Sequence, residues 1–258
     1  MDYYLNQKHL YLLSEYPKNF TFINNIKIYF YSSPILQKNN FNHAFFLKES
    51  SKIDIESHGE KLMKNNHNNC IIKQIHSNKI AFTSELKSQK IVIADGLICN
   101  NKNQNLWIYS ADCMPILFAD KYQRRIAAIH CGRKGLEKNI ISMAIKSFEI
   151  KGSSRKDIIV AIGPSISGDN YLLDKKTFYN FFCKSNEFLR KENKIENIDD
   201  DELVQLDIKR HAYLQLIMED IDPNNIDISN KCTFSLPEEL HSWRRSKNDE
   251  RQWSVICS

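Results

Sequence analysis

The stretch LWIYSADCMPILFADKYQRRIAAIHCGRKG, from Leu106 to Gly135, decides the fold that the sequence predicts. It contains three short apolar runs, Leu106–Tyr109, Met114–Ala119 and Arg125–Ile129, and the third run leads into His130. Each run is rich in β-branched or aromatic residues and is bounded by turn residues, which favours strands over helices.

A hairpin of the second and third runs would bring Cys113 and His130 together. If its turn is centred between Lys121 and Tyr122, these two residues face each other at the open end. Side chains paired in this way have Cβ atoms about 4.5–5.5 Å apart, so a thiolate and an imidazole could share one small cation. The open end of the hairpin is therefore a candidate site.

His76 lies within another strand-like stretch, Cys70–Thr83, just before the break expected at Ser77-Asn78, and is a third potential ligand. A histidine at a strand end is usually only hydrogen bonded, and a buried cysteine usually packs as a small apolar residue. The 37- and 17-residue gaps between His76, Cys113 and His130 fit no compact zinc signature. From the residues alone, a metal site and a purely structural role both stay open.

Length and composition predict one globular domain over residues 1–258. The 258 residues are 42% hydrophobic, enough for a real core, and the net charge of +5 is spread along the chain. We therefore expect a solvated surface, with no nucleic-acid partner. The seven cysteines lack CxxC spacing, and the N-terminus lacks the pattern of a signal peptide, which predicts a cytoplasmic protein with no membrane partner.

The flanking segments predict a mixed α/β fold. TFINNIKIYF around Asn24-Asn25 reads as a hairpin, and Asp95-Gly96 reads as a tight turn between two short strands. Apolar residues after Gly135 have helical spacing, and Asp207–Ile221 is a second helix ending before Pro223. We interpret 184–202 as a polar surface insertion, and the C-terminal tail as two strand-like pieces joined by a turn at Lys247–Glu250.

Several motifs together resemble the laccase-domain, YfiH-type family, whose members are described as polyphenol oxidases and as purine nucleoside phosphorylases. The matching stretches occur in the family's order across most of the chain: Gln74-Ile75-His76, Ala94-Asp95-Gly96-Leu97, Ala111-Asp112-Cys113-Met114-Pro115, His130-Cys131-Gly132-Arg133-Lys134-Gly135, Ile162-Gly163-Pro164 with Tyr171, and Ser242-Trp243-Arg244-Arg245 with Arg251-Gln252. An ordered set of this kind is far more specific than any one motif.

The resemblance implies a fold of mixed β-sheets packed in layers and flanked by helices, and it implies that His76, Cys113 and His130 are zinc ligands. It further implies phosphorolysis of adenosine, inosine and methylthioadenosine, with adenosine deamination as a companion activity. Two histidines and one thiolate leave a fourth position vacant, as expected of catalytic zinc. The substrates would be a nucleoside and phosphate, and we expect the backbone amides at the start of the helix after Gly135 to form an anion site.

Other residues of these motifs have both a functional and a structural interpretation. Asp112 and Gln74 are candidate catalytic residues, or else a turn residue and a strand cap. Arg133, Lys134 and Lys48 depart from the family's usual Trp, Arg and Arg. Lysine keeps a point charge but loses the bidentate fork, and Arg133 removes an aromatic platform. These three are candidate substrate contacts or plain surface charges, and Arg244 is a candidate substrate contact or a surface ion-pair residue.

Three functional hypotheses follow. The first is the zinc-dependent purine nucleoside phosphorylase. The second is a copper-dependent polyphenol oxidoreductase: the eight histidines include no His-X-His pair, which argues against a multi-copper cluster, although copper could occupy the three-ligand site. The third is a metal-free Cys-His hydrolase, or a catalytically silent binding protein. The sequence leaves the oligomeric state and the preferred nucleoside open.

Overall fold

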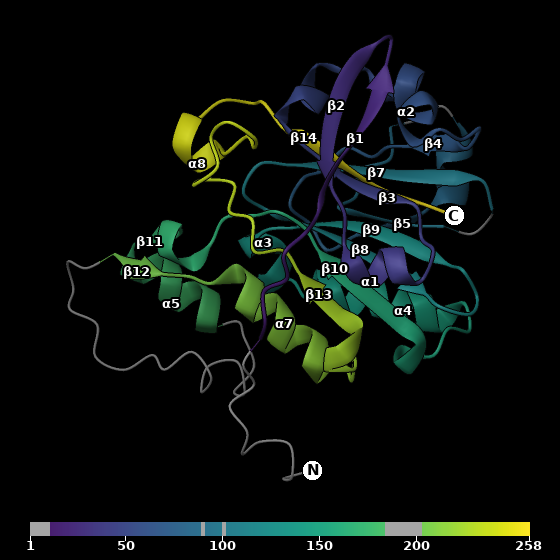
Figure 1. Cartoon of the computed structure of the whole chain (residues 1–258). Helices are drawn as coiled ribbons and strands as arrows, with labels where there is room; N and C mark the ends of the chain where they lie inside the picture. The colour runs from purple at the N-terminus through teal and green to yellow at the C-terminus, as the bar shows by residue number, and fades with distance from the viewer. Residues whose placement is uncertain (1–10, 89–90, 100–101, 184–202) are drawn as a thin grey trace.

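Two mixed six-stranded β-sheets pack face to face in the computed structural model, and helices cover their outer faces (Figure 1). The structure describes residues 11–88, 91–99, 102–183 and 203–258, so the insertion predicted at 184–202 lies outside the described residues. The first sheet has the order β1 (Lys18–Ile23), β2 (Ile26–Tyr31), β3 (His43–Phe46), β14 (Gln252–Cys257), β7 (Gln104–Ser110) and β4 (Asn68–Cys70). The second has the order β13 (Ile226–Ile228), β10 (Ile158–Ile162), β8 (Met114–Asp120), β9 (Ile126–Cys131), β6 (Gly96–Ile98) and β5 (Ile80–Phe82).

The remaining elements connect or cover these sheets. A two-stranded sheet joins β11 (Leu172–Leu173) to β12 (Val204–Gln205). The α-helices are α1 (Pro34–Lys38), α2 (Ile55–Met63), α3 (Arg133–Glu137), α4 (Ile140–Ile150), α5 (Lys175–Cys183), α7 (Ile208–Met218) and α8 (Trp243–Ser246). Short 3-10 helices are η2 (Lys48–Lys52), η3 (Thr83–Ser88), η4 (Arg155–Asp157), η5 (Gly168–Asn170) and η6 (Pro223–Asn225). This layered α/β architecture confirms the predicted fold class.

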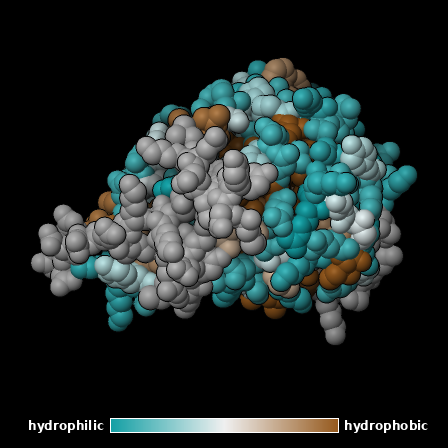
Figure 2. Space-filling model, turned by 90° about the horizontal axis from the view of Figure 1, so that it is seen from below, coloured by the Kyte–Doolittle hydropathy of each residue, from teal (hydrophilic) through white to brown (hydrophobic). Residues whose placement is uncertain are grey.

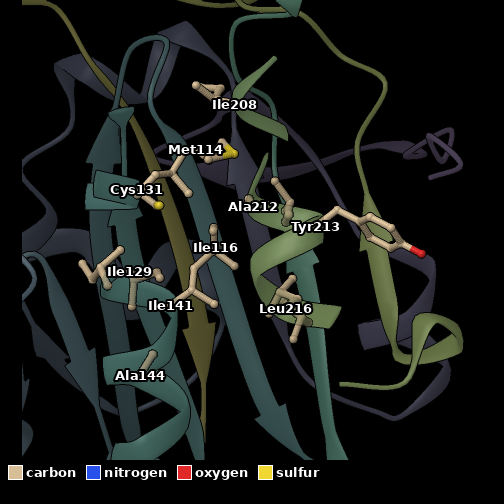
Figure 3. Close-up of a cluster of buried hydrophobic side chains, with 14 of the residues drawn as sticks. Met114, Ile116, Ile129, Cys131, Ile141, Ala144, Ile208, Ala212, Tyr213 and Leu216 are labelled. Carbon is tan, nitrogen blue, oxygen red and sulfur yellow. The ribbon is translucent and has the colours of Figure 1, made fainter. Parts of the chain in front are cut away.

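The second sheet is buried on both faces, which explains why β8, β9 and β10 read as continuous apolar runs. Alternation along β8 turns Ile116 toward α4 and α7, where it packs with Ile141 and Leu216 (Figure 3). Leu117 points the other way, into a core shared with the first sheet. A third cluster lies between the first sheet and α2. The layers are therefore, in order, α2, the first sheet, the second sheet, and the helices α4 and α7.

The predicted N-terminal hairpin is confirmed. β1 and β2 pair antiparallel, and Asn24 and Asn25 form the two-residue turn with φ of 47° and 64°. Both residues occupy the left-handed region, which asparagine tolerates better than most side chains and which a two-residue hairpin turn requires.

Three local features differ from those that the sequence predicts. The helix expected after Gly135 begins earlier, at Arg133, and is divided because Asn139 adopts φ 58° between α3 and α4. The first strand-like piece of the tail is the helix α8, which Ser242 caps by accepting a hydrogen bond from the Arg245 amide. Asp95 and Gly96 form no hairpin turn, because Gly96 is already the first residue of β6.

On the face seen in Figure 2, the described residues are mostly hydrophilic, with scattered apolar side chains. Cys70, Cys99, Cys113, Cys131, Cys232 and Cys257 are free thiols. No helix within the described ranges is both long enough and apolar enough to span a bilayer.

Candidate functional site

Three potential metal ligands converge from three separate segments of the chain. His76 comes from the loop between β4 and β5, Cys113 from the turn between β7 and β8, and His130 from β9. One ligand atom from each lies within 4.8 Å of the other two, and Cys113 Sγ is 4.0 Å from His76 Nε2. Zinc bonds of about 2.0–2.3 Å in a tetrahedron place ligand atoms roughly 3.5 Å apart. The donor set therefore fits a single ion after a small inward movement.

The hairpin that carries Cys113 and His130 has a different register from the predicted one. β8 pairs with β9 so that Pro115, not Cys113, faces His130. The turn is displaced by one residue because the Asp120 carboxylate accepts hydrogen bonds from the amides of Tyr122 and Gln123, both at 2.8 Å. Cys113 still reaches the site, because the chain turns at Asp112, whose φ is 84°.

Asp95, which the sequence analysis treated only as a turn residue, holds both histidine segments. Its buried carboxylate accepts a hydrogen bond from His130 Nδ1 at 3.0 Å and from the His76 amide at 2.9 Å. Burial alone would raise the pKa of Asp95, but the hydrogen bonds from His130 and Ser77 outweigh it and hold that pKa well below its usual range. No local pattern identifies this role, because the partners lie 19 and 35 residues away in sequence.

Cys113 and His130 each stabilise the charged form of the other. Burial opposes ionisation of Cys113, but His130 and His76 outweigh it and lower the pKa of the thiol. Burial likewise opposes protonation of His130, while Cys113 and Asp95 raise its pKa. The thiolate is the form of cysteine that binds metals and acts as a nucleophile.

The three potential ligands lie in a cavity of about 590 Å³. All predicted site residues except Lys48 line it. The lining residues are Gln74, His76, Tyr109, Ala111, Asp112, Cys113, His130, Gly132, Arg133, Lys134, Ile166, Tyr171, Ile208, Trp243, Arg244 and Arg251. Apolar and aromatic surface thus lies beside several cationic groups, as in pockets that bind small polar ligands.

Four of the lining residues carry positive charge. Arg133 forms an ion pair with Glu137 one helical turn later. The Arg244 guanidinium lies 4.9 Å from the centre of the Tyr171 ring and donates to Leu172 O at 2.9 Å. Lys134 and Arg251 complete the set. Such a concentration of cations suits an anionic ligand. The helix α3, whose first amides the sequence predicts as an anion site, begins before Gly135 and has only five residues.

Asp112 and Gln74 line the cavity, but their polar groups are engaged by the protein. Asp112 Oδ2 accepts from the Arg244 amide at 2.6 Å, and Oδ1 accepts from Thr233 Oγ1 at 2.6 Å. In the Gln74 side chain, Nε2 donates to Tyr109 O at 2.7 Å and Oε1 accepts from Tyr109 N at 2.9 Å. These contacts fix α8 and the end of β7 at the cavity.

Lys48 lies outside the cavity lining. Its ammonium donates to Pro237 O at 3.1 Å and lies 3.9 Å from Glu238 Oε2. Lys48 is the first residue of η2, which follows β3. In the first sheet β14 lies between β3 and β7, the strand that ends at the cavity. The geometry therefore gives no support to a substrate contact by Lys48.

Comparisons with known proteins connect this chain to a family. A family model described as multi-copper polyphenol oxidoreductase laccase matches residues 40–258. The chain is 30% identical over 208 residues to a protein of Synechocystis sp. named purine nucleoside phosphorylase, covering 72% of this chain and 78% of that protein. It is 32% identical over 176 residues to a protein of Rickettsia prowazekii with the same name, covering 68% and 70%.

Solved structures share the fold. The hypothetical protein YfiH of Bacillus licheniformis superposes with a TM-score of 0.71 at 21% identity, covering 89% of this chain and 96% of that one. YlmD of Geobacillus stearothermophilus superposes with a TM-score of 0.74 at 18% identity, covering 93% and 99%. The chain therefore belongs to the family described as multi-copper polyphenol oxidoreductase laccase, the YfiH-type family that its ordered sequence motifs resemble.

Proposed function

We propose that the protein is a zinc-dependent purine nucleoside phosphorylase, which converts adenosine, inosine or methylthioadenosine and phosphate to the free base and the pentose 1-phosphate. The observation that carries this proposal is the meeting of His76, Cys113 and His130 in a cavity that also carries four cationic side chains. Relatives at 30% and 32% identity bear the name purine nucleoside phosphorylase. We place the protein in the cytoplasm as a single domain, as its sequence predicts.

Zinc suits the donor set because two imidazoles and one thiolate bind this ion with one coordination position left open. When bound, zinc supplies Lewis acidity and lowers the pKa of a bound water toward neutrality. Water activation of this kind would support adenosine deamination as a side activity. Copper can occupy the same nitrogen and sulfur donors, but a single group of three metal donors within the described residues offers no multi-copper cluster.

The chain's own residues would bind and orient the two substrates. In phosphorolysis a phosphate oxygen attacks the anomeric carbon while the glycosidic bond to the base breaks. Arg133, Lys134 and Arg244 would hold the phosphate dianion, and Arg guanidinium groups can do so through two parallel hydrogen bonds. The apolar wall formed by Ile166 and Ile208 would exclude water from the nucleoside.

Asp112 and Gln74 would act in this scheme by position. Asp112 holds the Arg244 amide, and Gln74 holds the Tyr109 backbone. Each would therefore position a residue of the cavity and would not transfer a proton to the substrate. Both contributions agree with their places in the sequence motifs.

A second candidate function is a metal-free hydrolase that uses Cys113 as nucleophile. It is favoured by the row formed by Cys113, His130 and Asp95, in which the imidazole lies between a thiol and a carboxylate. This is the arrangement of an activated nucleophile, its base and an orienting acid. Removal of metal separates the two candidates, since it would abolish the phosphorylase and spare the hydrolase.

The test is incubation of the purified protein with adenosine or inosine, with and without phosphate. The proposal expects free base and ribose 1-phosphate only when phosphate is present, and loss of this product after treatment with a chelator. Free base and ribose formed equally without phosphate would show hydrolysis, and inosine formed from adenosine would measure deamination.

A further inference from the structure

Asp95 is a fully buried carboxylate that receives five hydrogen bonds, all from the segments that carry the two histidines. We propose that Asp95 is the positioning residue of the metal site, which orders both histidines before the ion arrives. This inference rests on the metal binding that the proposed function assigns to His76, Cys113 and His130, and it concerns a residue outside that set of ligands.

On the His130 side, Asp95 selects which ring nitrogen faces the cavity. His130 Nδ1 donates to Asp95 Oδ1 at 3.0 Å, and the His130 amide donates to Asp95 O at 2.7 Å. A proton fixed on Nδ1 leaves the lone pair of Nε2 free for a metal ion. Carboxylates bound in this way to metal-ligating histidines fix the tautomer and raise the basicity of the ligand.

On the His76 side, Asp95 stabilises a backbone conformation that the chain would otherwise avoid. His76 adopts φ 60°, in the left-handed region that residues other than glycine rarely occupy. Asp95 Oδ2 accepts from the amides of Ile75 and Ser77 at 3.2 and 2.6 Å, while Oδ1 accepts from the His76 amide at 2.9 Å. Three consecutive amides thus converge on one carboxylate.

Two further contacts tie the same segment. Ser77 Oγ donates to Asp95 Oδ2 at 2.7 Å, and Lys138 Nζ donates to His76 O at 2.9 Å. Lys138 immediately follows α3, which itself follows β9 and His130. The His76 loop is therefore held both by Asp95 and by the segment that follows His130.

An asparagine at position 95 would keep the size of the side chain and remove this function. Oδ1 and Oδ2 each accept at least two hydrogen bonds, so the amide NH₂ would face two donors in either orientation. If it faced His130, Nδ1 would have to accept, and the proton would move to Nε2, where it blocks a metal. If it faced Ser77, the left-handed loop would lose the acceptor of the Ile75 and Ser77 amides.

Asp120 offers a matched control in the same sheet. It is also buried, and its Oδ1 also accepts from two consecutive backbone amides, those of Tyr122 and Gln123. It ends β8, while Met114, one residue after Cys113, begins that strand. In Asp120→Asn the side-chain oxygen can still accept from both backbone amides, so the turn and the register of β8 and β9 are kept while a buried charge is removed away from the site.

The experiment compares zinc affinity by competition with a chromophoric chelator, and the absorption spectrum of the cobalt-substituted protein, in the wild type, Asp95→Asn and Asp120→Asn. We expect Asp95→Asn to bind zinc about 10- to 100-fold more weakly and to shift the cobalt–thiolate band. Asp120→Asn should keep the wild-type affinity and spectrum, even where it unfolds more easily. Equal zinc affinity in Asp95→Asn and the wild type, or an equal loss in Asp120→Asn, would overturn the proposal.

Amide hydrogen exchange in the metal-free protein tests Asp95 independently of any metal. Exchange at His76 and Ser77 should be slow in the wild type and in Asp120→Asn, and about tenfold faster or more in Asp95→Asn, since a lost hydrogen bond to a charged acceptor is worth at least that factor. Unchanged exchange in Asp95→Asn would refute the positioning role. If the wild type bound no zinc but Asp95→Asn still exchanged faster at His76 and Ser77, the proposed function would be contradicted. The conclusion that Asp95 orders the His76 loop would still be supported.

Discussion

Gly132 lies across the open end of the β8–β9 hairpin from Cys113, one step beyond the last pair, Met114 with Cys131. A Cβ atom on Gly132 would come within 2.3 Å of Cys113 Sγ and 3.8 Å of His76 Cδ2. The backbone of Gly132, with φ −96° and ψ −173°, is open to any residue. Glycine is needed here for space beside the thiol and not for its conformational freedom.

Gly132→Ala should therefore displace the Cys113 thiol while leaving the fold intact. We expect zinc affinity to fall about tenfold or more, the lower end of what disturbed metal-site geometry costs. Competition with a chelator measures the affinity, and urea unfolding of the metal-free protein should give a free energy within about 1 kcal/mol of the wild type. Unchanged zinc affinity would mean that the thiol does not bind the ion from its observed position.

Arg133→Ala should raise the KM for phosphate about tenfold or more, because a hydrogen bond to a charged group contributes about 1.5–3 kcal/mol. Arg133→Lys should recover only part of this loss, since lysine keeps the charge without the fork. The measurement is initial rate against phosphate concentration at saturating nucleoside. Arg155→Ala is the control, because Arg155 pairs with Glu149 and lies outside the cavity lining. A KM for phosphate equal in Arg133→Ala and Arg155→Ala would remove Arg133 from the substrate site.

His43 should make the protein less stable as the pH falls below 6.5. Its Nε2 accepts a hydrogen bond from the Ser33 amide at 2.7 Å, and Nδ1 lies 2.8 Å from Phe41 O, so the folded state needs the neutral ring. Burial lowers the pKa of His43 from 6.5 to about 4. Between these values the unfolded chain binds the proton and the folded chain does not, so stability falls with falling pH, by about 3 kcal/mol across the window.

Replacement of His43 by glutamine tests this directly, because the glutamine oxygen can accept from the Ser33 amide and does not titrate. The free energy of unfolding in urea is measured at pH 7 and pH 4 for both proteins. The variant should lose about 3 kcal/mol less than the wild type between these pH values. His211, whose pKa burial also lowers to about 4, stays in both proteins and cancels in the comparison. An equal loss in both proteins would show that His43 does not contribute.

The strands around the site could be predicted from local sequence, but their register could not. Met114–Ala119 is apolar throughout because both faces of its sheet are covered, and such a run is visible without a structure. The pairing with β9 depends on the Asp120 side chain, which caps its own turn and moves the centre by one residue. A one-residue change in a turn is below what composition can resolve, and it changes every cross-strand neighbour.

The cavity residues divide in the same way. The ordered motifs that resemble the family contain the three potential ligands and most of the cavity lining. Lys48 was placed with them by its motif alone, yet its ammonium contacts Pro237 O. Asp95 was missed because its importance comes from partners on two other segments, and only the folded chain brings those partners to one carboxylate.

The central claim is that His76, Cys113 and His130 bind one metal ion. Metal analysis of the purified protein tests this claim most directly. Protein purified without added metal is assayed for zinc and copper by elemental analysis, in the wild type and in Cys113→Ala. The account predicts one zinc ion per chain in the wild type and a large loss in the variant, with phosphorolysis lost in parallel. A wild type without metal, or a variant that retains the same zinc content as the wild type, would contradict it.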